Sequence, residues 1–265
     1  MKLIIRILSL MLATVLALSS FASCDILMGK PEDVIADAEA ELAKAPYTAD
    51  IDIEFSTDDP DMQSAISEIR DMHVSLSVNG DDATVSTRIS MSDTTVEVDC
   101  TFLDEMVYRK DYVKVGNRSG TIYRKAYASD ADVKILTEDA APGSEIDYFD
   151  FETVEMQTSG EIKLITCTDV KHESVESIKE LLADSLDISS DAISVSELEY
   201  IIRIKDGKYD GIYFTCTYSI GISGEVYDVT LRMVTSYDYT TPVEISVPED
   251  TSEYNNVALE EIIDL

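Results

Sequence analysis

The chain has 265 residues with a formal net charge of -33, and apolar residues make up 45% of it. This negative field disfavours nucleic acid as a partner, because no cluster of Lys and Arg with interleaved aromatic residues offsets it. Electrostatic attachment to anionic lipid is disfavoured for the same reason. The apolar fraction indicates a packed domain rather than a disordered chain, with its acidic residues on solvated faces.

The first 23 residues have the pattern of a secretory signal peptide. Lys2 and Arg6 give a short basic start, residues 7–18 are almost entirely apolar, and small residues follow. The apolar run is too short for a helix that crosses a bilayer, which needs roughly 20 apolar residues. We therefore expect residues 1–23 to be removed on export.

Cys24 is the expected site of lipidation. Residues 21–24 read Phe-Ala-Ser-Cys, which resembles the bacterial lipobox, where the Cys thiol is acylated and becomes the new N-terminus. Phe21 stands where Leu is usual, and ordinary secretion with cleavage after Ala22 remains the alternative. Lipidation predicts a protein anchored at the extracytoplasmic face of the cell membrane by acyl chains, more than one of which is needed for stable binding.

A helix and a series of strands are predicted after a short tether, residues 24–30. Residues 31–45 have apolar positions near a 3.6-residue spacing, with Pro31 in the first turn. Residues 49–56 alternate between apolar and polar, as in a strand with one wet face. A short helix ending near Met72 is expected next, and then a strand from His73 to a tight hairpin turn at Asn79 and Gly80.

The remaining elements complete one domain over residues 31–250, followed by a tail, residues 251–265. A short helix is expected within the acid-rich stretch, at residues 130–136, and the strongest later helix at residues 173–186. The other strands are expected at residues 95–102, 106–110, 112–115, 121–127, 151–157, 162–168, 198–204, 212–220 and 227–233.

The cysteines and histidines indicate neither a metal site nor catalysis. Cys100 and Cys216 fall on the apolar face of their strands and Cys167 lies in another strand, so buried free thiols are expected, although the spacing leaves pairing among the three open. No CxxC or HxxxH spacing occurs. His73 and His172 lie near no recognisable nucleophile, so we expect neither an enzyme nor a cofactor.

The chain resembles the LolA/LolB lipoprotein carriers, and more closely the lipoproteins of Gram-positive bacteria that share their fold. The resemblance covers residues 31–248 and rests on the lipobox-type start and on residues 108–112, 205–211, 237–239 and 243–248. It implies an α+β fold in which a curved antiparallel half-barrel wraps over a few helices. It also implies an apolar cavity between sheet and helices that takes up lipid or lipid-linked groups.

The resulting functional hypothesis is a membrane-anchored lipoprotein that binds or carries a hydrophobic or lipidic ligand. Aromatic and aliphatic residues on the apolar face of the strands are the candidate ligand contacts, namely Phe102, Phe214, Tyr218, Val229, Leu231 and Met233. The alternative is an anchored, non-enzymatic interaction or sensing module with a solid core that binds a protein or a glycan. A third and weaker alternative is an extracytoplasmic hydrolase. A cavity of several hundred Å³ would favour the carrier over the module.

Overall fold

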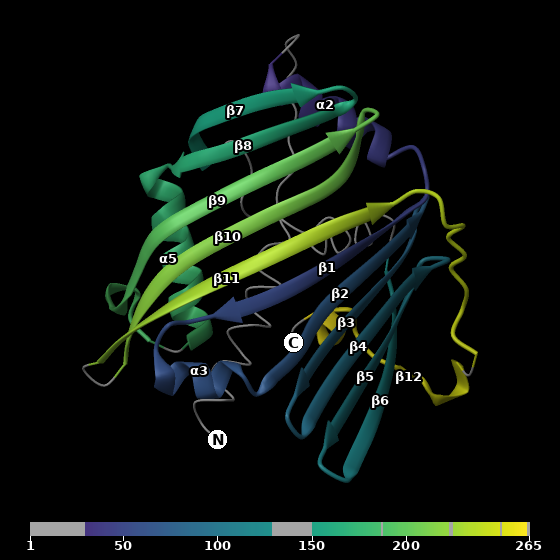
Figure 1. Ribbon diagram of the computed structural model, residues 1–265. Coiled ribbons are helices and arrows are strands. Elements are labelled where there is room, and N and C mark those ends of the chain that lie inside the picture. Colours follow the sequence, from purple (N-terminus) through teal and green to yellow (C-terminus); the bar gives the residue numbers. More distant parts are fainter. Residues whose placement is uncertain (1–29, 129–149, 187, 223–224, 250, 264–265) are drawn as a thin grey trace.

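The computed structural model describes residues 30–128, 150–186, 188–222, 225–249 and 251–263, and their strands form one open 12-stranded sheet (Figure 1). The strand order is β12-β6-β5-β4-β3-β2-β1-β11-β10-β9-β8-β7. Neighbouring strands are antiparallel, apart from the short parallel pair of β12 and β6. Two meanders therefore meet side by side where β1 pairs with β11.

The strands are long, and most of them follow one another through tight turns. The first meander contains β1 (Tyr47–Ser56), β2 (Ile69–Asn79), β3 (Asp82–Met91), β4 (Thr94–Leu103), β5 (Met106–Val115) and β6 (Arg118–Tyr127). The second contains β7 (Phe151–Ser159), β8 (Ile162–Val170), β9 (Ile193–Lys205), β10 (Lys208–Ile222) and β11 (Glu225–Asp238), and β12 (Asn255–Asn256) completes the sheet. The predicted turn at Asn79 and Gly80 is confirmed, because Gly80 has a φ of 67°, a left-handed conformation that suits glycine.

The helices are few and cover one face of the sheet. They are α2 (Pro31–Leu42), α3 (Pro60–Ile66), α5 (His172–Leu186) and α6 (Glu260–Ile263), with short 3-10 turns at Ser190–Ala192 and Thr251–Glu253. Both α2 and α5 lie behind the second meander in the view of Figure 1. Asp33 accepts a hydrogen bond from the backbone amide of Lys30, 3.0 Å away, which satisfies an amide at the start of α2.

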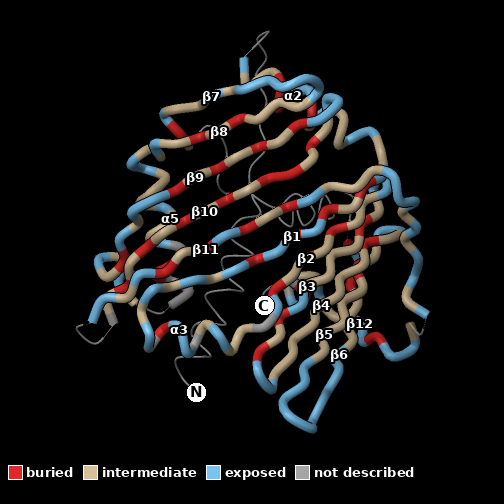
Figure 2. The backbone as a smooth tube through the Cα atoms, in the orientation of Figure 1, coloured by how far each residue is buried: buried red, intermediate tan, exposed pale blue. Residues whose placement is uncertain are grey.

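The main core lies between these helices and the sheet. Val34, Ile35 and Ala38 of α2 and Leu182 of α5 are buried against the strands, and buried residues alternate with more exposed ones along β9 to β11 (Figure 2). This alternation follows from the two-residue period of a strand. We call the helix-covered face the inner face and the opposite face the outer face.

The predicted α+β class is wrong. Strand accounts for 61% of the structure and helix for 19%, so the fold is closer to all-β. The cause is the length of the strands, since β9, β10 and β11 alone have 13, 15 and 14 residues. The helices that the resemblance implied are present, but they are short compared with this sheet and cover only part of it.

The helices predicted at residues 31–45 and 173–186 are confirmed as α2 and α5. The helix expected to end near Met72 ends instead at Ile66, because β2 begins at Ile69 and pairs with β3 from Met91 onward. The signal peptide, Cys24 and the predicted helix at residues 130–136 lie outside the described residues.

The C-terminal segment wraps around the edge strand β6. Tyr254 packs its ring against Tyr108 and Tyr123, whose side chains lie on the outer face. Asn255 and Asn256 then pair with β6 along its edge. Past that edge, Ile262 is buried on the inner face in a second apolar cluster, with Phe102, Val107, Ala126 and Ala128. The segment therefore covers part of an edge that would otherwise expose unpaired backbone groups.

Candidate functional site

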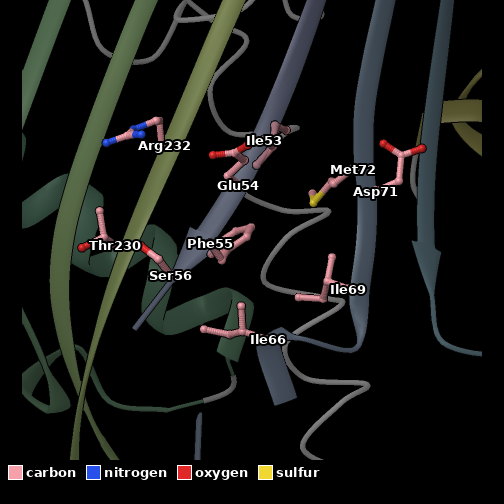
Figure 3. Close-up of a pocket in the computed structure, with 10 residues that line it drawn as sticks. All are labelled: Ile53, Glu54, Phe55, Ser56, Ile66, Ile69, Asp71, Met72, Thr230 and Arg232. Carbon is pink, nitrogen blue, oxygen red and sulfur yellow. The ribbon is translucent and has the colours of Figure 1, made fainter. Parts of the chain in front are cut away.

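A pocket of about 310 Å³ lies where β1 and β2 separate (Figure 3). Pairing between these strands ends at Asp52 and His73, whereas β1 continues beside β11 as far as Ser56 and Thr230. The chain between β1 and β2 forms α3, which contributes Ile66 to the pocket wall. The two strands therefore separate because a short helix lies between them in the chain. We call the pocket at this separation the fork pocket.

The pocket lining is apolar with a polar rim. Five side chains form its apolar wall: Ile53, Phe55, Ile66, Ile69 and Met72. The polar residues are Glu54, Ser56, Asp71, Thr230 and Arg232. Glu54 and Arg232 are cross-strand partners, and the two-residue period of a strand puts them on the opposite face from Phe55. An apolar wall with few polar groups suits an amphiphilic ligand.

An aliphatic strip on the inner face extends from the pocket across β3 to β6. Directly paired residues of an antiparallel sheet share a face, so Met72, Ile89, Val96 and Val113 form one row across β2 to β5. Met72 and Ile89 are buried, Val96 is half-buried and Val113 is 43% exposed. The apolar surface thus opens progressively toward the β5–β6 hairpin.

The apolar members of the neighbouring row show the same trend, with Val74 buried, Val98 half-buried and Ile122 exposed to 52%, although Thr87 and Asp111 alternate with them in this row. Val115, near the hairpin turn, is exposed to the same extent. Half of the exposed large apolar residues in the described chain lie here, because Val113, Val115 and Ile122 are three of six. We call Val96, Val98, Val113, Val115 and Ile122 the open strip.

Charged side chains border the open strip on the same face. Asp111 lies between two arginines: its Oδ1 is 2.8 Å from Nη2 of Arg109, and its Oδ2 is 3.2 Å from Nη1 of Arg124. Nη1 of Arg109 also donates to the backbone carbonyl oxygen of Ile262, 2.6 Å away. The side chains of Arg109, Asp111 and Arg124 are only 13%, 15% and 23% exposed. We call these three residues the charged triad.

The structure places five of the six predicted ligand contacts together in the main core. Phe214 pairs with Met233 and Tyr218 with Val229, while Leu231 lies between them on β11. All five are buried and pack with α2 and α5 residues in one cluster. Phe102 is buried as well, but in the second cluster beside Ile262.

None of these six residues lines the pocket at the fork. The charged triad was missed in the sequence, although a signal for it existed. Arg109 and Asp111 occupy the same alternate positions as the apolar Val107 and Val113 of β5, so the two-residue period places all four on the inner face.

The thiols of Cys100 and Cys216 are free, as predicted. Cys216 is buried, and so is Cys167, whereas Cys100 is half-buried. Burial raises the pKa of the Cys216 thiol to about 12. Burial raises the pKa of Cys100 to about 11, although the Arg109 guanidinium opposes that shift. Neither thiol is poised as a nucleophile, because the thiolate is the reactive form.

His73 lies on the outer face between two carboxylates. Its Nδ1 is 3.0 Å from Oδ1 of Asp52 and its Nε2 is 3.3 Å from Oδ1 of Asp50.

Within the described ranges, no three His, Cys, Asp or Glu residues are grouped so that they could hold a metal ion. No helix in the same ranges is long and apolar enough to cross a membrane.

No protein-family model matches the chain, and no curated protein matches it.

Proposed function

We propose that this protein is a lipid-anchored extracytoplasmic lipoprotein that binds a hydrophobic or amphiphilic molecule without transforming it. The observation that carries the proposal is the alignment of the fork pocket with the open strip on the inner face: the pocket residue Met72 stands in one row with Ile89, Val96 and Val113, of which Met72 and Ile89 are buried and the last two are increasingly exposed. Single exposed apolar residues are ordinary, but a contiguous apolar surface indicates a binding site. The anchor is proposed at Cys24, and the likeness to the LolA/LolB carriers points in the same direction.

The size of the pocket supports an elongated ligand that is only partly enclosed. Small-molecule sites occupy roughly 300–1,000 Å³, so a pocket of about 310 Å³ is at the small end of this range. An acyl chain that leaves the pocket along this row passes the buried Ile89 before it reaches Val96 and Val113 of the open strip. The proposed ligand thus lies on β1 to β6, whereas five of the six contacts predicted from the sequence lie on β10 and β11 and only Phe102 lies on β4.

The alternative is an interaction module, and the packing of the second meander favours it. Phe214, Tyr218 and Leu231 are buried among other side chains, as in a solid core. In that case the open strip would meet a protein and not a lipid. The two functions differ in whether the isolated protein takes up a fluorescent fatty-acyl probe.

Probe binding by the full-length protein tests the proposal. Val113→Glu and Ile122→Glu each place a charge on the open strip at an exposed position, where the fold should tolerate it. Each should weaken binding by about tenfold, because burying one aliphatic side chain contributes about 1.5 kcal/mol and 1.4 kcal/mol is a factor of ten. Val226→Glu, at a residue exposed to 69% on β11, is the matched control and should bind as the wild type does.

A wild-type protein that takes up no acyl probe, or two strip variants that bind as well as Val226→Glu, would contradict the proposal. Either result would leave the interaction module as the better account.

A further inference from the structure

We infer that the ligand is an anionic amphiphile, whose charged head binds at Arg124 while its apolar chain lies on the open strip. This inference rests on the proposed function and assigns the class of its ligand. The structural basis is the position of the charged triad on the inner face, where Asp111 lies between Val98 and Ile122 of the open strip and the two arginines occupy the next row.

Strand register places the triad directly beside the strip. Arg109 and Arg124 are cross-strand partners, as are Asp111 and Ile122, and all four lie on the inner face. On the other side of the triad, Phe102 and Ile262 are buried in the second apolar cluster, so the exposed apolar surface ends there. A chain lying on Val113 and Ile122 would therefore meet charge where the surface ceases to be open.

Hydrogen bonding within the triad leaves donors at Arg124. Arg109 uses Nε and Nη2 on Asp111 and Nη1 on the Ile262 carbonyl, and Asp111 has both oxygens engaged. Arg124 bonds to Asp111 through Nη1. No other partner of the Arg124 guanidinium is found among the described residues, so its Nε and Nη2 remain for a ligand. A planar guanidinium with two donors suits a carboxylate or a phosphate.

Net charge distinguishes an anionic ligand from a cationic one. The triad carries two positive charges and one negative charge, whereas the chain as a whole has a formal charge of -33. The acidic surface as a whole repels an anion, so a largely buried site with a net positive charge gives the anion a specific place to bind. The low dielectric of the apolar surroundings strengthens that attraction.

The binding of cis-parinaric acid and of its uncharged methyl ester to the full-length protein tests the inference. Both have the same fluorescent chain, so the difference between their affinities measures the head group alone. At neutral pH the Kd of the acid should be at least about tenfold lower than the Kd of the ester. A cationic alkylamine should not displace the acid better than an uncharged alcohol of equal chain length.

Arg124→Gln should remove the preference for the acid and leave the affinity for the ester unchanged. Arg203→Gln is the matched control, because Arg203 is an outer-face arginine whose Nε is 2.9 Å from Oδ2 of Asp210. That variant should keep the preference. If Arg124→Gln fails to fold, Arg124→Lys retains the positive charge and should still prefer the acid.

Competition by dodecyl phosphate and by dodecanoate identifies the head group. Stronger displacement by the phosphate assigns a phosphate head, stronger displacement by dodecanoate assigns a carboxylate, and both results support an anionic ligand. Equal affinity of the wild type for acid and ester would overturn the inference while leaving the proposed function intact. Binding of neither molecule would overturn both.

Discussion

Arg109 and Ile262 are 153 residues apart in the chain, yet Nη1 of Arg109 donates to the backbone carbonyl oxygen of Ile262 at 2.6 Å. This bond joins the middle of β5 to the last helix of the described chain. The same arginine is paired with Asp111, so one side chain both fixes the C-terminal segment and neutralises a largely buried carboxylate.

Replacing Arg109 should loosen that segment. Arg109→Met keeps an apolar stem but leaves the Ile262 carbonyl and part of the Asp111 carboxylate without a partner, which should lower the free energy of unfolding by about 2–3 kcal/mol. Urea denaturation measures this loss. Hydrogen exchange of residues 254–263 should also become faster than in the wild type.

Arg88→Met is the matched control for this prediction, because Arg88 is 55% exposed and its Nε lies 3.7 Å from the carboxylates of Asp71 and Glu97. Exposed pairs contribute about 0–1 kcal/mol, so this variant should be nearly neutral. Equal losses from the two substitutions would show that the C-terminal contact has no special role.

Leu231→Ala tests the solid core of the second meander. Leu231 is buried among core residues on β11, and truncation of such a side chain typically lowers stability by about 2–5 kcal/mol. The melting temperature should therefore fall, while the folded fraction should retain its affinity for the acyl probe. Loss of probe binding without loss of stability would instead place the ligand at the residues chosen from the sequence.

The free thiols should differ in their reactivity when the protein is folded. Because burial raises the pKa of Cys216 to about 12 and that of Cys100 to about 11, both should react slowly with iodoacetamide near neutral pH. Cys100 is half-buried and should react first, and both should react fully in denaturant. Mass spectrometry of the alkylated peptides gives the order, and Cys216 reacting before Cys100 would contradict the assignment of burial.

The tyrosines around Tyr47 should make stability fall at alkaline pH. The ring of Tyr47 lies 6.1 Å from that of Tyr237 and 6.2 Å from that of Tyr239, and burial raises the pKa of Tyr47 to about 12 and that of Tyr237 well above its usual value. The folded protein therefore keeps phenol protons that the unfolded chain loses near pH 10. Their contribution is fully present below that pH and is lost as the pH rises toward the folded values.

Urea midpoints measured between about pH 8 and about pH 11 should show this decline, since unfolded tyrosine titrates near pH 10. Tyr47→Phe keeps the ring but removes one of the titrating groups, so its midpoint should fall less steeply. A slope identical to that of the wild type would exclude Tyr47 as a source of the alkaline loss.

Cys24→Ser tests the proposed anchor. The variant should leave the membrane fraction and lack the mass of the acyl chains, because the serine hydroxyl does not replace the acylated thiol. Cell fractionation and mass spectrometry of the N-terminal peptide measure the two effects. A variant that remains with membranes, or a wild-type peptide without an acyl group, would contradict lipidation.

Local patterns in the sequence determined most of the secondary structure. Alternation in residues 49–56 predicted β1, the Asn79-Gly80 pair predicted a turn, and the apolar spacing of residues 173–186 predicted α5. These signals depend on neighbours a few residues apart, so the sequence alone contains them. The inward direction of Phe214 and Met233 follows from the same two-residue period.

Only the tertiary structure decided where apolar side chains meet solvent. Phe214 and Val113 both lie on the inner face. Helices α2 and α5 cover the second meander and bury Phe214, while Val113, in the first meander, stays 43% exposed. The fork pocket likewise requires β1 to pair with β11, a contact between residues more than 170 positions apart, such as Thr48 and Asp238. The period of a strand specifies which way a side chain points, but burial depends on which distant segment packs over it, and no local pattern encodes that.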